Sequence, residues 1–277
     1  MKKILLSNLA LVTSLLLTLT LNSVSIEGAL YQDPSLSYSG SGKPYGTLSI
    51  AGTNPSSEGM EGKRFYHLVT VLGERAEKLA NLKSGAGLRM TARLEYFTFE
   101  NEAGEKQARN KLTIASSREL LEPGTFTTVT REERGETLFV LDRGESSVTL
   151  EGIVMANRGL SVTAGLGGDT YTVLTVAYPN PAYFEGGSAP QVGYVEVLVM
   201  GSEAEKVAGL GAGWGIEISG RTYLPKKGVA NGLAIYADRT LAFSLEAPPL
   251  VGAQVTPLEV HELLGSLPEG ELEDYLA

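Results

Sequence analysis

Cysteine is absent from the chain, and histidine is nearly so: His67 and His261 are the only two among 277 residues. The lack of cysteine excludes disulfides, thiolate zinc sites and cysteine nucleophiles. Two histidines leave almost no room for a histidine metal cluster, so the sequence predicts no bound metal. We also expect no cofactor.

No set of residues indicates catalysis. Residues 40–43 (GSGK) are similar to part of a phosphate-binding loop, but Pro44 stands where Ser or Thr would bind magnesium. Residues 209–213 (GLGAG) lack the strand–turn–helix setting of a dinucleotide site. His67 has no serine nucleophile at a matching spacing. These absences predict a protein that is not an enzyme.

The composition favours a folded, turn-rich β protein. Apolar residues make up 43% of the chain, which is enough to bury a core, and 33 glycines favour turns over helices. The net charge of −9 opposes attraction of the whole molecule to nucleic acid. Any nucleic-acid binding therefore needs a local basic patch.

An internal repeat organises the sequence. Residues 23–28 (SVSIEG) recur as residues 147–152 (SVTLEG), 124 positions later, and Tyr66 recurs as Tyr194, 128 positions later. The offset grows in steps, as loop insertions between matching elements would make it, so the repeat predicts two tandem copies of one domain. The predicted organisation is an apolar extension, a first domain, a linker, a second domain and an acidic tail: residues 1–21, 22–121, 122–142, 143–246 and 247–277.

Residues 1–21 begin with two lysines after the first methionine and continue as a mostly apolar run without charge. The segment is similar to a secretory signal peptide or a short membrane anchor, but no small-x-small cleavage site follows it. The alternatives are an upstream extension from a wrongly chosen start codon, or an extra buried segment.

Each copy contains short apolar or alternating segments separated by Gly, Pro, Asn and Ser. The expected strands of the first copy are residues 23–30, 46–52, 65–71 and 87–99. Residues 74–82 are rich in helix formers, and a polar tip at residues 100–106 predicts a hairpin that adds a fifth strand. The predicted fold class is all-β: two tandem OB-fold five-stranded barrels, each with one short helix between strands 3 and 4.

Three segments of the first copy are informative through their order and spacing along the chain. Residues 22–42 hold an opening strand followed by Asp33 and Pro34, residues 66–77 a third strand and helix entry, and residues 93–104 a fourth strand and long hairpin. Together they resemble the bacterial single-stranded DNA-binding protein family, in the two-OB form of the Deinococcus–Thermus group. The resemblance covers the first domain well and the second weakly.

The resemblance implies sequence-independent binding of single-stranded DNA, with bases stacked on Tyr66 and Phe99. Tyr194 matches Tyr66 in the second copy, and Trp214 is either a stacking residue or a plug in the core. The first domain has 12 basic against 11 acidic residues (net +1) and the second 7 against 10 (net −3), so we expect the first to carry more of the affinity. The candidate DNA-binding residues are Tyr66, Phe99, Lys63, Arg64, Lys106, Arg109, Lys111, Arg93, Tyr38, Tyr194 and Trp214.

The resemblance also implies a homodimer with four OB-folds, a role in DNA replication, recombination and repair, and a cytoplasmic, nucleoid-associated location. The family's acidic tail docks on replication and repair proteins. Residues 247–277 hold six acids and no Lys or Arg, but lack the family's Pro-Phe ending. The alternative is an exported or membrane-anchored OB-type β protein that binds a protein or a sugar, with residues 1–21 as its export signal.

Overall fold

The described residues of the computed structural model fall into two compact units. The N-terminal unit consists of Ser23–Glu95 and Lys111–Ser147. The C-terminal unit consists of Tyr96–Asn110, the residues up to Asn22 and those from Val148 on. The residues that the structure describes are 19, 21–54, 64–79, 81–100, 104, 106–115, 121–124, 128–133, 136–141, 144–162, 169–181, 192–223 and 233–244.

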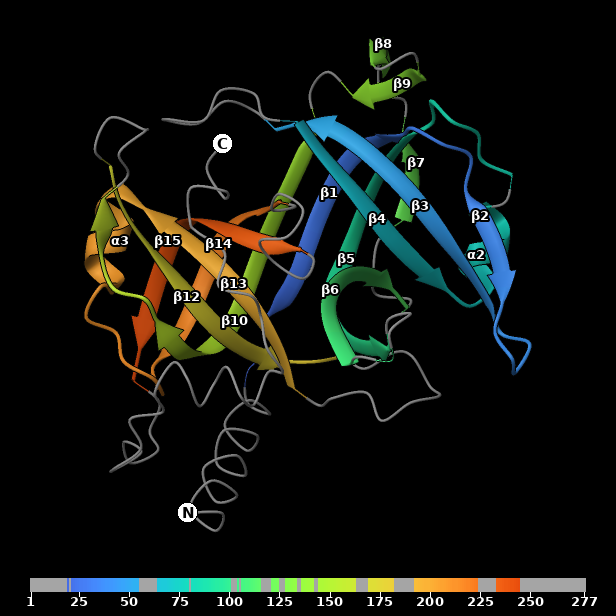
Figure 1. Ribbon diagram of the computed structural model, residues 1–277. Helices are drawn as coiled ribbons and strands as arrows, with labels where there is room; N and C mark the ends of the chain where they lie inside the picture. The colour runs from blue at the N-terminus through green and yellow to red at the C-terminus, as the bar shows by residue number, and fades with distance from the viewer. Residues whose placement is uncertain are drawn as a thin grey trace. The chain divides into compact units, whose positions relative to one another are not determined.

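Five strands of the N-terminal unit close into a barrel. The elements in this part of the chain are β1 (Asn22–Leu30), β2 (Ser35–Tyr38), β3 (Pro44–Thr53), β4 (Arg64–Leu72), α2 (Glu74–Leu79), β5 (Gly87–Glu100), β6 (Lys106–Ile114), β7 (Leu121–Gly124), β8 (Thr128–Glu133) and β9 (Glu136–Leu141). Around the barrel, β1 pairs with β5, β5 with β6, β6 with β4, β4 with β3, and β3 with β1 again (Figure 1). Strand β2 extends this sheet beside β3.

The C-terminal unit repeats the same circuit. Its elements are β10 (Glu145–Asn157), β11 (Ser161–Val162), β12 (Thr170–Pro179), β13 (Val192–Met200), α3 (Gly201–Val207), β14 (Gly215–Tyr223) and β15 (Ala234–Phe243). Strand β10 pairs with β14, β14 with β15, β15 with β13, β13 with β12, and β12 with β10 (Figure 1). Two five-stranded barrels confirm the predicted all-β, tandem OB-fold architecture.

Side-chain alternation explains why these segments form barrel strands. Along β4, Phe65, His67 and Val69 are buried, whereas Arg64 and Leu68 are exposed. A strand turns successive side chains to opposite faces, so one face of β4 lines the core and the other faces outward. The expected strands of the first copy all overlap observed ones, namely β1, β3, β4 and β5.

The repeated glycine of the two copies stands where the barrels close. A Cβ atom at Gly28 would lie 2.5 Å from Cγ2 of Ile50 and 2.9 Å from the carbonyl oxygen of Ala51, on the strand that pairs with β1. At Gly152, 124 positions later, a Cβ would collide with Val176 on β12 in the same way. Only glycine allows the first and second strands to approach this closely.

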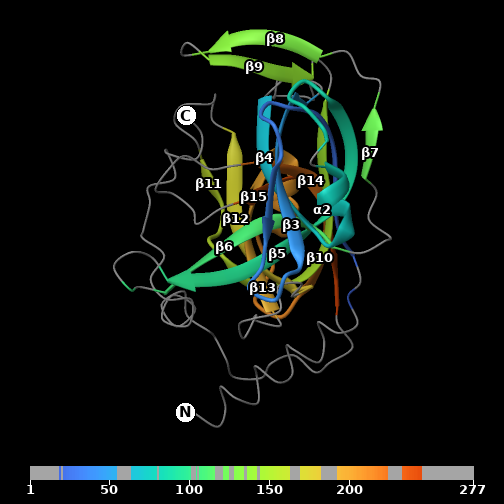
Figure 2. The same ribbon diagram turned by 90° about the vertical axis from the view of Figure 1, so that its right-hand side faces the viewer.

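Residues 122–142, predicted as a linker, contribute strands to the N-terminal unit. Strands β8 and β9 form an antiparallel hairpin, and β9 joins β3 at the pair formed by Gly52 and Leu141 (Figure 2). Strand β7 pairs with β5. The described part of this segment is therefore paired β-structure, because it extends the sheet along edges that the barrel strands present.

Two residues of the apolar N-terminal extension are described, and both belong to the C-terminal unit. Leu19 is 9% exposed and packs in an apolar cluster of β10, β12 and β13. The N–H of Glu151 donates to the carbonyl oxygen of Leu21 at 2.9 Å, and the N–H of Leu21 donates to Oε2 of Glu151 at 3.1 Å. Leu19 is thus buried in this unit, whereas Leu21 is 37% exposed and is held by backbone hydrogen bonds. Residues 1–18 and the tail, 247–277, lie outside the described residues.

No helix within the described ranges is long and apolar enough to cross a membrane.

The core of the N-terminal unit contains a neutral histidine. His67 is 2% exposed; its Nε2 lies 2.8 Å from Oγ of Ser146, and its ring stacks on Phe65 with centroids 5.2 Å apart. Asn54 accepts a hydrogen bond from the N–H of Ser146 at 2.8 Å. The start of β10 is thereby attached to the ends of β3 and β4. Burial lowers the pKa of His67 from 6.5 to about 4, since a protonated ring would carry its charge out of contact with water.

We predict that wild-type stability falls on mild acidification because of His67. In the unfolded chain the imidazole takes up a proton near pH 6.5, whereas in the folded protein it does so only near pH 4. Stability that is fully present above pH 6.5 is therefore lost as the pH falls towards 4, by about 2 kcal/mol between pH 7 and pH 5. Urea unfolding at both pH values measures the loss.

The matched control is His67→Gln, which keeps a hydrogen-bonding side chain but has no proton to bind in this range. Its free energy of unfolding should fall about 2 kcal/mol less than that of the wild type over the same interval. Identical losses in both proteins would show that His67 does not cause the acid sensitivity.

Candidate nucleic-acid interface

The outer side of β4 carries aromatic, apolar and basic side chains. Arg64, Tyr66 and Leu68 alternate with buried residues and project away from the core. Leu68 is 60% exposed, and Tyr66 is partly buried. Tyr31, just after β1, meets the Tyr66 ring edge-on, with centroids 6.1 Å apart. We call this set the strand face of the N-terminal unit: Tyr31, Arg64, Tyr66 and Leu68.

Two candidate residues of the N-terminal unit lie on other surfaces. Tyr45 on β3 pairs with Leu72 on β4 and so lies on the same side of the sheet as the strand face. Tyr38 pairs with Pro44, the neighbour of Tyr45, and so lies on the opposite side. The Tyr38 ring, 58% exposed, therefore projects on the side where β3 approaches α2. Arg93 lies on β5 in phase with Arg89, whose guanidinium pairs with a β1 carboxylate on the outside of the β1–β5 pair. Tyr38 therefore lies on the side of the sheet opposite the strand face, whereas Arg93 faces outward on β5, two strands from β4 around the barrel.

The end of the β5–β6 hairpin, Tyr96–Asn110, belongs to the C-terminal unit and presents its own aromatic face. The rings of Phe97 and Phe99 stack with centroids 5.7 Å apart and planes 29° apart. The guanidinium carbon of Arg109, on β6, lies 4.7 Å from the Phe99 centroid, within cation–π range. Arg109 is exposed and both rings are partly exposed. We call Phe97, Phe99 and Arg109 the hairpin face.

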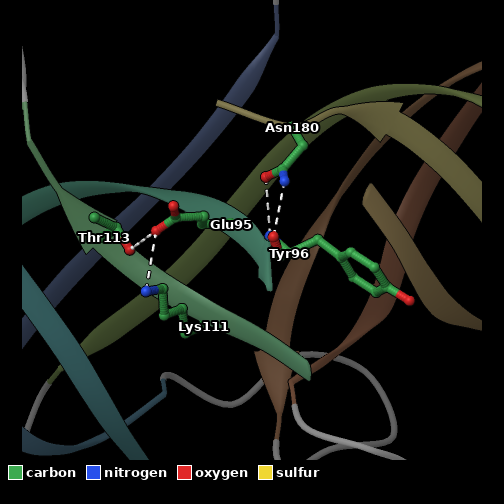
Figure 3. Close-up of polar contacts among 5 residues, drawn as sticks. All are labelled: Glu95, Tyr96, Lys111, Thr113 and Asn180. Atoms are coloured by element: carbon green, nitrogen blue, oxygen red, sulfur yellow. Dashed lines mark hydrogen bonds and ion pairs between the residues drawn. The ribbon is translucent and has the colours of Figure 1, made fainter. Parts of the chain in front are cut away.

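Lys111 lies in the N-terminal unit and is not part of the hairpin face. Its Nζ lies 3.4 Å from Oε2 of Glu95, a carboxylate only 1% exposed, and Oγ1 of Thr113 donates to the same oxygen at 2.6 Å (Figure 3). Burial lowers the pKa of Lys111, and the Glu95 charge opposes that shift. The Lys111 ammonium thus neutralises a buried carboxylate instead of facing solvent.

Tyr194 differs from Tyr66 in its surroundings. Its ring meets Tyr96 edge-on, with centroids 5.9 Å apart, and packs against the cluster that contains Leu19 and Val192. Burial raises the pKa of the Tyr194 phenol. The two tyrosines match in sequence position and both are partly buried, but Tyr194 also packs against an apolar cluster of its unit.

Trp214, in the turn between α3 and β14, is 43% exposed. The interpretation of Trp214 as a core plug is therefore wrong. The backbone of the turn is fixed instead, because Gly213 and Trp214 both hydrogen-bond the backbone of Val154, and the ring stays at the surface. Lys63 lies outside the described residues, and of Lys106 the structure describes only its place in β6.

Three residues of these faces were missed by the sequence analysis: Tyr31, Leu68 and Phe97. The spacing of Phe97 and Phe99 was an available signal, because residues two apart in a strand share a face. Tyr31 reaches Tyr66 through strand pairing that no local pattern reveals. Leu68 is exposed on β4, but leucine is usually a core residue, so the residue type did not indicate a surface position.

The fold defines a tandem OB-fold protein, and comparison with known proteins shows which proteins the chain is similar to. Residues 21–120 match the Single-strand binding protein family. The chain is 27% identical over 209 residues to the single-stranded DNA-binding protein of Deinococcus radiodurans, a match that covers 73% of this chain and 66% of that protein, just under two thirds of its length.

Two crystal structures of the single-stranded DNA-binding protein from Thermus aquaticus have a similar fold. A deletion mutant gives a TM-score of 0.60 at 23% identity, covering 83% of this chain and 97% of that one. The wild type gives 0.59 at 22% identity, covering 82% and 95%. The predicted resemblance to the two-OB form of the single-stranded DNA-binding protein family is confirmed.

We predict that Lys111→Met destabilises the protein by about 3–5 kcal/mol, because it leaves the Glu95 carboxylate buried without its counter-charge. The free energy of unfolding at pH 7, from urea denaturation, measures the cost.

The control is the double variant Lys111→Met with Glu95→Gln, which removes both charges and keeps an acceptor for Thr113. It should recover most of the lost stability, since the penalty comes from the unpaired charge. If the double variant is as unstable as the single one, Lys111 stabilises the protein through the packing of its aliphatic stem and not through charge pairing.

Proposed function

We propose that this protein binds single-stranded DNA without sequence preference, and that it does so without catalysing a reaction. The observation that carries the proposal is the hairpin face, in which two stacked phenylalanine rings stand at the surface with a guanidinium over one of them. Base–aromatic stacking tolerates any sequence because every base has a π face. The family match and the similar proteins support the same function.

Two surfaces supply the binding groups. On the strand face, Tyr66 offers a ring and Arg64 a charge for the phosphate backbone. On the hairpin face, Phe97 and Phe99 offer rings and Arg109 the charge. We leave Lys111, Tyr38 and Arg93 out of these surfaces, because Lys111 is paired with a buried carboxylate, Tyr38 projects from the opposite side of the sheet and Arg93 lies on β5, two strands from β4.

The wider role is also part of the proposal. We infer that two chains pair into a dimer with four OB-folds, and that the protein protects exposed strands during replication, recombination and repair in the cytoplasm, in association with the nucleoid. We further propose that the acidic tail, residues 247–277, recruits protein partners. The similar proteins lend no support to an exported protein that binds a protein or a sugar.

The first test is salt dependence. If Arg64, Arg109 and other cations neutralise phosphates, the logarithm of affinity for oligo-dT should fall linearly with the logarithm of salt concentration, with a slope of about −0.7 per phosphate contacted. Fluorescence titration across a range of sodium chloride concentrations measures the slope. A flat response would contradict electrostatic tracking of the backbone.

The second test removes one ring from the strand face. Tyr66→Ala should lower affinity for oligo-dT about 10- to 100-fold, the cost of one lost stacking contact. Tyr38→Ala is the matched control, because it removes a ring of the same size from the opposite side of the sheet. Titrations at one fixed salt concentration, after circular dichroism shows both variants folded, compare them. Equal losses would mean that DNA does not distinguish the two sides.

A further inference from the structure

Alternation divides the hairpin end into two sides with different surroundings. Phe97, Phe99 and Arg109 share one side, where the rings stack and the guanidinium covers one of them. Tyr96 and Asn110 are each one residue out of phase with that side, so they project from the opposite one. Both of the latter contact β12, β13 or the residue after β12 within the C-terminal unit.

Two asparagines fix the second side of the hairpin to these strands. The side chain of Asn180 binds the Tyr96 backbone twice: its Oδ1 accepts from the Tyr96 N–H at 2.9 Å and its Nδ2 donates to the Tyr96 carbonyl oxygen at 2.7 Å (Figure 3). Asn110 donates from Nδ2 to the carbonyl oxygen of Tyr194 at 2.8 Å and accepts at Oδ1 from the Tyr178 hydroxyl at 2.7 Å. Each hairpin strand thus has its own polar anchor.

The anchored contacts are partly shielded from water. Asn180 is 9% exposed, and Tyr178 is fully buried. Burial raises the pKa of Tyr96 to about 12 and that of Tyr194 above its usual value, in agreement with the edge-on packing of these two rings. Partly buried polar contacts of this kind favour one arrangement, since an unmade hydrogen bond would leave a partly desolvated group.

We propose that Tyr194, Asn180 and Asn110 are positioning residues, which seat the hairpin so that Phe97, Phe99 and Arg109 form a rigid DNA-binding surface of the C-terminal unit. Tyr194 therefore does not stack a base, although it matches Tyr66 in the repeat. The inference rests on the proposed function and names which side chains of this unit meet the DNA. A surface held in its bound arrangement avoids the ordering cost of a free hairpin.

A double-mutant cycle separates seating from stacking. Tyr194→Ala and Asn180→Ala are each measured in the full-length wild type and in a Phe97→Ala/Phe99→Ala background, by titration with oligo-dT at fixed salt. We expect each variant to weaken binding by about 10-fold or more in the wild type and to have no further effect once the phenylalanines are gone, because they act through the same surface. Tyr194→Phe should retain wild-type affinity, since it keeps the edge-on contact with Tyr96.

Two controls come from this chain. Tyr66→Ala, in the other unit, should cost the same in both backgrounds, as independent sites do. Asn157→Ala removes hydrogen bonds to the carbonyl oxygens of Val207 and Leu210 at the end of α3 within the same C-terminal unit, and should leave DNA affinity unchanged. It tests whether a general loss of stability in this unit lowers binding.

Amide hydrogen exchange of the free protein measures how firmly the hairpin end is held, in the absence of DNA. Asn180→Ala should raise exchange across Tyr96–Asn110, whereas Asn157→Ala should not. Unchanged exchange in Asn180→Ala, an equal loss from Tyr194→Ala in both backgrounds, or full wild-type affinity in both single variants would each overturn the inference. Failure of the wild type to bind oligo-dT would instead reject the proposed function, and the exchange result would still decide the seating.

Discussion

The alternation of side chains along β5 and β6 is the constraint on which the rest of the structure depends. A strand has two faces, and each residue is committed to one of them by its position in the sequence. In the N-terminal unit this places Glu95 and Lys111 together as a buried pair. Two positions further along each strand, the same phase places Phe97 beside Phe99 and Arg109 at the surface of the C-terminal unit. The same alternation thus yields an ion pair with a buried carboxylate and an aromatic surface on the same pair of strands.

The compact units do not coincide with the copies of the repeat. Residues just before the repeated strand of the first copy, Leu19 and Leu21, pack in the C-terminal unit. Residues just before the second repeated strand, Gly144 and Ser146, pack in the N-terminal unit, where the N–H of Gly144 donates to a β3 carbonyl oxygen at 2.8 Å. The hairpin end adds a further segment of the first copy to the C-terminal unit. Each compact unit therefore includes residues from outside its own copy of the repeat. Neither copy alone, with the bounds that the repeat gives it, contains all the residues that pack in its unit.

This exchange explains which features were predictable from sequence. The barrel strands were predictable, because period-two patterning and the repeated glycines at 28 and 152 are local or periodic signals. The outward orientation of Tyr66 on an alternating strand was predictable for the same reason. The burial of Lys111 was not, because it depends on Glu95, a partner brought close by the pairing of two strands. The seating of the hairpin depends on Asn180, 84 residues from Tyr96 along the chain. An asparagine after a strand reads as an ordinary turn residue.

The same packing accounts for the asymmetry of the two copies. The positions of Leu68 and Thr70 on β4 correspond, 128 residues later, to Glu196 and Leu198 on β13. Leu198 is 4% exposed, and the Glu196 carboxylate pairs with Arg158 at 2.8 Å. The Glu196 carboxylate would repel the phosphates of DNA, and the buried Leu198 offers no exposed group to bind it. This side of β13 is therefore poorly suited to binding DNA. The hairpin that contacts β13 at Tyr194 supplies two phenylalanines and an arginine on its outer side. The C-terminal unit therefore presents an aromatic, basic surface although its own strands do not encode one.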